Sequence, residues 1–429
     1  MLTSLFAQHR ALIRIFLPAI GGVAALVMLH PWVKARLGRH FPYIIGVSWV
    51  FTRVVLFVLI YIFCVMPGTF DDLSQPYDTT VEGGWVYQAT GVIAGLMPYR
   101  DFFSNYSVLY SYIISLPYRM WQSPSAFVPL YILFDLGCLF LIYGVAKSRW
   151  GKELARDAVV LFTFAPITWY VTIRYSQDEI LIAFFALAAT YAWVKNKRIL
   201  ASVLLGLGFC CTKFMFGLII LPFLLMSDRK LRDTGVVAAV ILAINLPFVL
   251  AGANVLSPFS NQEGTFCGAG FWPMVVSLFG LSEHDPALFR GAIFLLLIPL
   301  LVSIYLIPRR KIWPADAACA LMMVFIALSP KTVLLYALGY MPLFMVYAVG
   351  EREVLNLVLF SVFGLIIPKF VINSPPTSVV HISLMIVYSL YITVVQLYWA
   401  WKILRSYKKK AGGLPEETPS PVTPAKTAA

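Results

Sequence analysis

The sequence predicts an all-α polytopic membrane protein with roughly 11–13 transmembrane helices of about 20 residues each. Hydrophobic residues fill 60% of the 429 positions and charged residues only 12%, whereas about a quarter of the residues in a soluble domain are charged. Apolar runs of span length recur along the whole chain. These runs are continuous, unlike the alternating segments of about ten residues that β-barrels show, so the spans are expected to be helices.

The net charge of +13 is explained by the membrane rather than by nucleic acid. The basic residues lie in short clusters between apolar runs, which is the pattern of cytoplasmic loops under the positive-inside rule. We therefore place all of these clusters on the cytoplasmic side: Lys34, Arg36 and Arg39; Lys147, Arg149, Lys152 and Arg156; Lys195, Lys197 and Arg198; Arg229, Lys230 and Arg232; Arg309, Arg310 and Lys311; Lys402, Arg405 and Lys408 to Lys410.

The first apolar runs are followed by an acidic stretch. Residues 15–29 form a first span or an interfacial helix, because no small-residue cleavage site of a signal peptide follows them. Residues 43–66 are predicted to span, and Arg53 within them requires an acidic partner such as Asp135. Residues 68–106 then form a first external loop, rich in acidic residues.

The external loop is expected to contain short helices at the membrane surface. Residues 83–99 predict an interfacial helix, with Trp85 and Tyr87 in the headgroup zone. Residues 107–116 are apolar but too short to cross, so we expect them to be partly embedded. For Asp78 and Glu82 a functional role is favoured over that of solvated loop charges, while Asp71 and Asp72 fit both interpretations equally.

The remaining chain continues as spans up to residue 410, so that 1–410 is one transmembrane domain. The later spans are predicted at 126–146, 157–173, 179–194, 235–251, 288–307, 315–329, 331–348, 353–371 and 380–401. Residues 199–226 are long for one span and predict either a broken hairpin or a tilted helix. Residues 252–287 form a second external loop. Residues 411–429 are rich in Pro and Thr and predict a disordered cytoplasmic tail.

With the basic clusters inside, the polar motifs converge on the opposite face. The topology closes if 107–116 does not cross and 199–226 is a hairpin. The acidic loop, residues 174–179, Lys213, the 252–287 loop and Pro330-Lys331 then all lie outside. A functional site assembled from these motifs is therefore expected on the extracytoplasmic side.

Several of these motifs suggest anion binding. Ser176 and Glu179 have the spacing of a helix-capping box, which leaves Arg174 and Asp178 at the membrane surface beside a helix N-terminus that favours phosphate. Lys213 lies inside an apolar run at a cost of about 2.5–3.5 kcal/mol. A lipid-phosphate contact is favoured there over snorkelling of the side chain to the interface.

Other polar positions carry a weaker signal. A lysine at a helix start opposes the helix dipole, so Lys331 predicts an anionic partner. Glu263 and the SEHD cluster at 282–285 favour solvated loop charge. The six cysteines show neither a disulfide framework nor metal spacing and fit small apolar residues in helices. No metal site is predicted from the histidines and carboxylates.

The order of motifs resembles a known family. The acidic loop is followed by G-L-M-P-Y-R-D-F-F-S-N-Y-S-V-L-Y, S-Q-D-E, G-L-G-F-C-C-T-K and S-P-K-x-x-x-x-Y. Over roughly residues 43–350 this series resembles the polyprenyl-phosphate-sugar-dependent glycosyltransferases of the GT-C superfamily, and most closely the mannosyltransferases that use dolichol- or polyprenyl-phosphate mannose. The resemblance implies a GT-C-like fold, a catalytic carboxylate in the first external loop and a lipid-linked donor in a groove between spans.

The family's acidic motif is incomplete here. Many members carry Asp-Glu, then Tyr three and Ala seven residues after the Glu; Glu82, Trp85 and Ala89 occupy those places, but Val81 replaces the Asp. The catalytic base is therefore Glu82 by spacing, Asp78 by residue type, or Asp71 or Asp72 under another alignment. The resemblance further implies donor-phosphate contacts by Arg174, Lys213, Lys331 and Arg100, and substrate contacts by Tyr99, Asp101, Tyr106, Gln177, Asp178 and Glu263.

These features together predict an inverting hexosyltransferase, with mannose as the expected sugar and a glycan or glycolipid as the acceptor. A polyprenyl phosphate leaving group needs neither nucleotide nor cofactor, and metal dependence is left open. A bacterial inner membrane is favoured over the endoplasmic reticulum. Two alternatives remain: a transporter or flippase of a lipid-linked saccharide, which would also use intramembrane charge and broken helices, and a non-catalytic subunit of a glycosylation complex.

Overall fold

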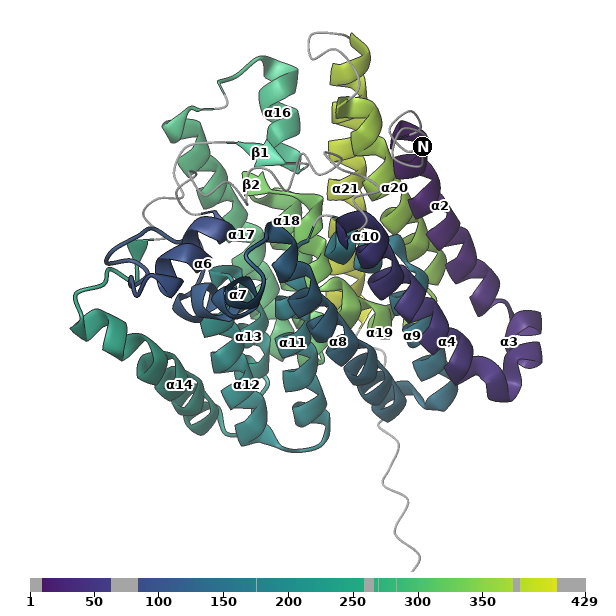
Figure 1. The fold of residues 1–429 in the computed structure, drawn as a ribbon, viewed down its shortest axis with the longest axis horizontal. Coiled ribbons are helices and arrows are strands. Elements are labelled where there is room, and N and C mark those ends of the chain that lie inside the picture. Colours follow the sequence, from purple (N-terminus) through teal and green to yellow (C-terminus); the bar gives the residue numbers. More distant parts are fainter. Residues whose placement is uncertain are drawn as a thin grey trace, which may run out of the picture.

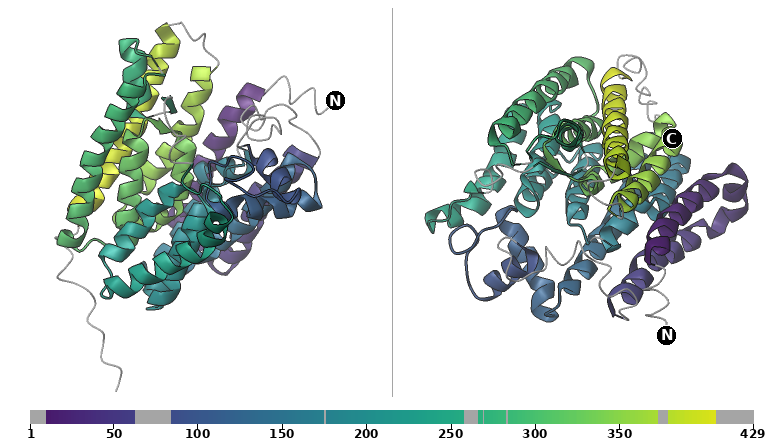
Figure 2. Two further views of the ribbon diagram at one scale, coloured as in Figure 1. Left: turned by 90° about the vertical axis from the view of Figure 1, so that its left-hand side faces the viewer. Right: turned by 90° about the horizontal axis from the view of Figure 1, so that it is seen from above.

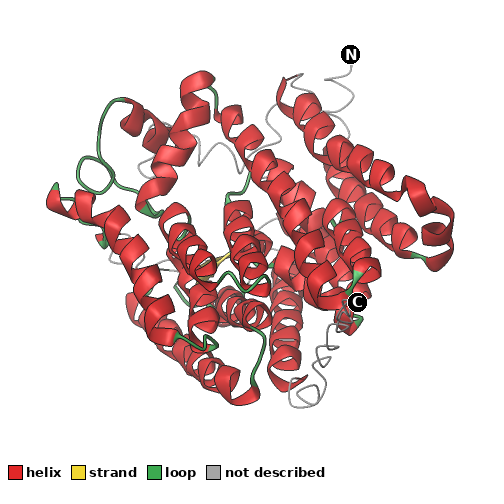
Figure 3. Cartoon of the chain, turned by 90° about the horizontal axis from the view of Figure 1, so that it is seen from below, coloured by secondary structure: helices red, strands yellow, loops and turns green. Residues whose placement is uncertain are grey.

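The structure is a computed structural model of the chain, in which residues 10–62, 84–174, 176–257, 266–268, 270–282, 284–372 and 379–406 are described. Within these ranges the chain is helical apart from loops and two short strands (Figure 1). Figure 3 shows the strands near the middle of the helical bundle. The predicted all-α class is confirmed.

The helices follow the predicted runs closely at most positions. The N-terminal part contains α2 (Arg10–Leu29), α3 (Pro31–Leu37) and α4 (Phe41–Val50), extended by the π-helical segments η2 (Phe51–Val55) and η3 (Val58–Ile62). The external loop contributes α6 (Trp85–Ile93) and α7 (Val108–Met120). The central part contains α8 (Phe127–Trp150), α9 (Lys152–Phe164), α10 (Pro166–Arg174), α11 (Glu179–Val194), α12 (Arg198–Cys211), α13 (Gly217–Leu225) and α14 (Lys230–Leu250). The C-terminal part contains α16 (Phe271–Phe279), α17 (Pro286–Arg310), α18 (Pro314–Leu328), α19 (Met341–Glu351), α20 (Val354–Ile372) and α21 (Val379–Ser406).

The described part of the chain contains fewer full-length spans than the 11–13 expected. Six helices are long and apolar enough to cross a membrane, or seven if the bent pair α2 and α3 is one span. Six further apolar helices are shorter: Glu179–Val194, Arg198–Cys211, Phe214–Leu225, Pro314–Leu328, Met341–Glu351 and Val354–Pro368. The chain is thus a multi-pass helical membrane protein, but many apolar runs fold as short helices because polar or proline residues interrupt them.

Burial separates the central helices from those facing lipid. Almost every side chain of α18 and α19 is buried, while α14 and α17 expose most of theirs, including Leu242 and Leu297. Figure 2 shows α2 and α4 on one flank of the bundle and α14 on the other. Helices of similar apolar composition therefore lie in two environments, the protein interior and the surface that faces the lipid acyl chains.

The prediction of a single span at 331–348 is wrong. This segment contains strand β2 (Lys331–Thr332), the 3-10 helix η6 (Leu334–Gly339) and the first part of α19. Strand β2 pairs in parallel with β1 (Cys267–Gly268), with Lys331 opposite Cys267. Cys267 and Gly268 of the 252–287 loop therefore lie beside Lys331 and Thr332.

The basic clusters meet at the opposite end of the bundle, the lower end in Figure 1. Lys34 pairs with Asp157 at 2.9 Å, and Arg149 donates to Asp316 at 2.7 Å. Arg310 Nη1 donates to the Leu404 carbonyl at 3.0 Å. These contacts join clusters that are far apart in the sequence, which agrees with their assignment to one side. We call this the basic end.

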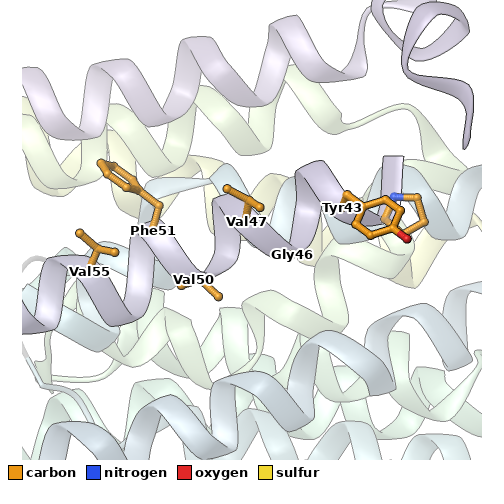
Figure 4. A pocket seen from close by; sticks show the side chains of 7 residues that line it. Tyr43, Gly46, Val47, Val50, Phe51 and Val55 are labelled. Carbon is orange, nitrogen blue, oxygen red and sulfur yellow. The ribbon is translucent and has the colours of Figure 1, made fainter. Parts of the chain in front are cut away.

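Arg53 is paired with Asp135, as predicted. Arg53 Nε lies 3.0 Å from Asp135 Oδ1, and both side chains are fully buried. The guanidinium also donates to the carbonyls of Phe162 and Thr163, where α9 ends. The opposite face of this helix is apolar and outward-facing, with Tyr43, Val47 and Phe51 around a shallow pocket (Figure 4). The charge is thus held entirely on the protein side of the span.

Candidate functional site

The candidate site is organised around Lys213, which lies in the break between two short helices. The predicted broken form of residues 199–226 is confirmed: α12 ends at Cys211, and α13 begins at Gly217 after one 3-10 turn. Arg198 at the start of α12 lies within electrostatic range of Asp228, just after α13, so the two helices form a hairpin from the basic end. The break places Lys213 at the far tip of that hairpin.

Two buried carboxylates hold the Lys213 ammonium. Its Nζ lies 3.1 Å from Asp178 Oδ1 and also forms an ion pair with Glu179 Oε1. The side chains of Asp178 and Glu179 are almost completely buried, while that of Lys213 is 16% exposed. Burial raises the pKa of Asp178, and the Lys213 charge opposes this rise. Two carboxyl groups therefore contact one ammonium group in this triad of Lys213, Asp178 and Glu179.

Carboxylate oxygens of both Asp178 and Glu179 lack a hydrogen-bond donor among the described residues. Glu179 Oε2 is buried and accepts no hydrogen bond from the residues that the structure describes. A buried carboxylate oxygen without a donor costs free energy, so such atoms are normally satisfied by water or a ligand. The triad therefore retains capacity for a hydroxyl-bearing molecule.

Two tyrosine rings flank the triad from opposite parts of the sequence. Lys213 Nζ lies 5.2 Å from the ring centre of Tyr106, in the first external loop, and 4.6 Å from that of Tyr336, in η6. These are cation–π distances. Trp85 Nε1 donates to the Tyr106 hydroxyl at 2.8 Å, and Tyr106 stacks on Tyr110 with ring centres 4.0 Å apart. The aromatic rings therefore have fixed positions beside the ammonium.

The aromatic packing corrects the expected role of Trp85. The sequence placed this residue in the lipid headgroup zone, but its side chain is buried and packs edge-on against Phe127 and Tyr131 of α8. Helix α6 is also pinned to α7 by Gln88, which accepts hydrogen bonds from Ser104 and Ser111. The described part of the external loop is thus docked onto the bundle.

The capping box predicted for Ser176 and Glu179 is wrong. Asp178 is the N-cap residue of α11, without a side-chain cap, and Glu179 binds Lys213 instead. Ser176 has a positive φ of 48° and its hydroxyl shares a 2.9 Å hydrogen bond with that of Tyr61. A capping box is recognised from neighbouring residues alone. The sequence pattern therefore could not show that Glu179 pairs with Lys213, which lies between α12 and α13.

The other predicted site residues are distributed as follows. Arg174 is buried at the end of α10, within electrostatic range of the Tyr61 hydroxyl. Gln177 is half-buried in the turn before Asp178, and its backbone N–H donates to the Val171 carbonyl. Lys331 has an exposed side chain on β2. The structure thus brings Tyr106 and Asp178 to Lys213, with Arg174 and Gln177 on the adjoining turn.

The turn at residues 99–101 is not linked to the triad by any contact of the described residues. Arg100 and Asp101 pair with each other at 2.8 Å on the surface, and no described contact links them to Lys213. Tyr99 is buried and packs against Ala253, beyond the end of α14. Several predicted positions lie outside the described residues: Asp71, Asp72, Asp78, Glu82, Glu263 and the tail 411–429.

An apolar groove borders the site. It has a volume of about 470 Å³ and lies between α6, α7 and the end of α12. Val92, Leu109 and Ile113 line it, together with Cys211, two residues before Lys213. The groove is thus connected to the triad through the end of α12.

Sequence reasoning missed Glu179 and Tyr336 as members of the site. The sequence pattern predicts a helix-capping role for Glu179. Tyr336 is present only as the last residue of the S-P-K-x-x-x-x-Y motif. That motif was the available signal for Tyr336. Comparison of the sequence with protein-family models and with curated proteins gives no match, so the site is interpreted from its own chemistry.

Proposed function

We propose that the chain is an integral membrane glycosyltransferase with a GT-C-like fold. It transfers a hexose, with mannose as the expected sugar, from a polyprenyl-phosphate donor to an acceptor hydroxyl, with inversion, on the extracytoplasmic side of a bacterial inner membrane. The observation that carries the proposal is the triad of Lys213, Asp178 and Glu179 between the rings of Tyr106 and Tyr336. Charged groups bind sugar hydroxyls strongly, and aromatic rings cover the apolar face of a pyranose.

The triad is assigned to the sugar rather than to the phosphate. Two carboxyl groups already contact the Lys213 ammonium, which disfavours a phosphate there, while the buried Oε2 of Glu179 is an acceptor for a sugar hydroxyl. The phosphate is assigned to Lys331, whose exposed side chain has no acidic partner among the described residues. Arg100 is neutralised by Asp101 and suits this role less well.

The groove beside Cys211 supports a lipid-linked donor. Its lining is mostly apolar, with Tyr112, Ser115 and Arg119 as the polar members, and α6 and α7 supply most of it. A polyprenyl chain in this groove would bring the attached sugar phosphate to the hairpin tip that carries Lys213. A soluble nucleotide-linked donor has no lipid chain that could occupy this groove.

The reaction requires one carboxylate base. A loop carboxylate, Glu82 or Asp78, or Asp71 or Asp72, removes the proton of the acceptor hydroxyl. The resulting oxygen attacks the anomeric carbon as the bond to the phosphate oxygen breaks, and the polyprenyl phosphate leaves with that electron pair. Lys331 stabilises the charge that develops on the leaving phosphate.

The test is a transfer assay with the purified full-length protein. A radiolabelled polyprenyl-phosphate mannose is supplied with glycan and glycolipid acceptors, and Glu82→Gln, Asp78→Asn and Lys213→Ala are compared with the native chain. Loss of the base is expected to slow transfer by about 10²–10⁴-fold. The matched control is Lys402→Ala, which removes a lysine paired with buried Glu353 at the basic end. Full turnover by all three variants would contradict the site.

The same preparation separates transfer from transport. Sealed vesicles containing the protein and a fluorescent lipid-linked saccharide are examined for movement of the lipid between leaflets. Movement of the lipid without formation of a glycosidic bond would show that the protein is a flippase rather than a transferase. Activity that appears only with a co-purifying membrane protein would identify the chain as a subunit of a larger enzyme.

A further inference from the structure

A second groove lies on the lipid-facing surface, at the end of the bundle opposite the candidate site. It has a volume of about 670 Å³ and is formed by α17, α18 and α21. Ile298, Val302 and Leu306 line it from α17, and Leu397 and Trp401 line it from α21. Ile298, Val302 and Trp401 are more than half exposed, so the groove faces the acyl chains of the membrane.

Both walls of the groove end in an arginine at the basic end. On α17 the lining positions Ile298, Val302 and Leu306 are spaced four residues apart, and the next step is Arg310. On α21 the series Leu397 and Trp401 leads by the same spacing to Arg405. Residues four apart share one helix face, so each apolar stripe terminates in a guanidinium.

The two guanidinium groups have donors available. Arg310 uses only Nη1 in its hydrogen bonds to the carbonyls of Leu404 and Arg405, so its Nε and Nη2 have no acceptor among the described residues. The Arg405 guanidinium lies over the Trp401 ring, with Cζ 4.8 Å from the ring centre, and its side chain is exposed. No described carboxylate pairs with either arginine. The mouth of the groove is therefore positively charged.

We propose that this groove is a binding site for an anionic phospholipid of the cytoplasmic leaflet. One acyl chain lies along the apolar stripes, and the headgroup phosphate bridges Arg310 and Arg405, since guanidinium groups match phosphate oxygens in geometry and charge. Both α17 and α21 are long enough to cross the membrane, so their basic ends lie at headgroup depth. Cytoplasmic leaflets are rich in anionic lipids. This site is separate from the proposed transfer reaction.

The test measures lipid retention by the purified full-length protein. Native mass spectrometry counts phosphatidylglycerol and phosphatidylcholine bound from equal mixtures in detergent. The native chain should retain phosphatidylglycerol preferentially, and Arg405→Gln should reduce that preference about fivefold. Arg405 donates no described hydrogen bond, so this variant is expected to fold, and its thermal unfolding is checked in parallel.

Two further variants separate the groove from general surface charge. Arg309→Gln removes a neighbouring arginine that lies over Tyr305 and does not line the groove, and it should keep the preference. Val302→Trp fills the groove while leaving both arginines, and it should lower retention of phosphatidylglycerol. Equal retention of the two lipids by the native chain, unchanged preference in Arg405→Gln, or an equal loss in Arg309→Gln would overturn the proposal.

Discussion

The backbone N–H of Ser107 donates a 2.9 Å hydrogen bond to the carbonyl of Thr212. Ser107 ends the described part of the external loop and precedes α7, whereas Thr212 lies in the break after α12. The carbonyls at a helix end need partners from outside the helix, and here the loop supplies one. Tyr106 directly precedes Ser107, and Lys213 directly follows Thr212, so this contact brings Tyr106 and Lys213 into one site.

The triad around Lys213 should be essential for stability as a unit. Removing the ammonium in Lys213→Met leaves two buried carboxylates without a counter-charge, which is expected to cost about 3–5 kcal/mol. The triple variant Lys213→Met, Asp178→Asn, Glu179→Gln should recover most of this loss. Thermal unfolding in detergent measures both. Equal stability of Lys213→Met and the native chain would show that the ion pairs do not form.

The Arg53–Asp135 pair should behave in the same way, without any link to transfer. Both side chains are fully buried, so Arg53→Met alone is expected to destabilise by about 3–5 kcal/mol. The double variant Arg53→Met, Asp135→Leu should be markedly more stable than the single one. The recovery will be incomplete, because Arg53 also satisfies the carbonyls of Phe162 and Thr163. Chemical unfolding of the three proteins tests this order.

The aromatic ring of Tyr336, not its hydroxyl, should matter for transfer. Tyr336→Phe keeps the ring beside the Lys213 ammonium, so transfer efficiency is expected to stay near the native value. Tyr336→Ala removes a contact worth about 0.5–2 kcal/mol, which corresponds to a loss of roughly two- to thirty-fold. The matched control is Tyr398→Ala on the exposed face of α21. If Tyr336→Phe and Tyr336→Ala were equally impaired, the ring would not be the relevant group.

The Arg100–Asp101 turn should resist acid until low pH. Hydrogen bonds from the Arg100 guanidinium and from the Met97 backbone N–H lower the pKa of Asp101 to about 2, compared with about 3.9 in an unfolded chain. A depressed carboxyl pKa stabilises the fold above the unfolded pKa, and the contribution is lost as pH falls through the folded value. Asp101→Asn should therefore lower the unfolding temperature at pH 7 and at pH 5 alike. The difference from the native chain should shrink towards pH 2.

Much of the candidate site could be predicted because its members break local rules. Lys213 stands out as a charge in an apolar run, and Asp178 and Tyr106 belong to polar motifs on the face opposite the basic clusters. The clusters of basic residues also predicted which helix ends lie together, because lysine and arginine in short loops mark one side of the membrane. Arg53 and Asp135 could be matched for the same reason, as two buried charges that require each other.

The sequence by itself therefore determined the class of the protein, the positions of most helices and the face on which its polar motifs gather. Only the tertiary structure decided that Glu179 binds Lys213 rather than capping its helix, that Trp85 lies in the protein interior and that residues 331–348 are a strand and two short helices. Apolar length and charge are properties of one segment and can be read locally. An ion pair, a ring contact or a buried face depends on which distant segment arrives beside it, and no local pattern contains that information.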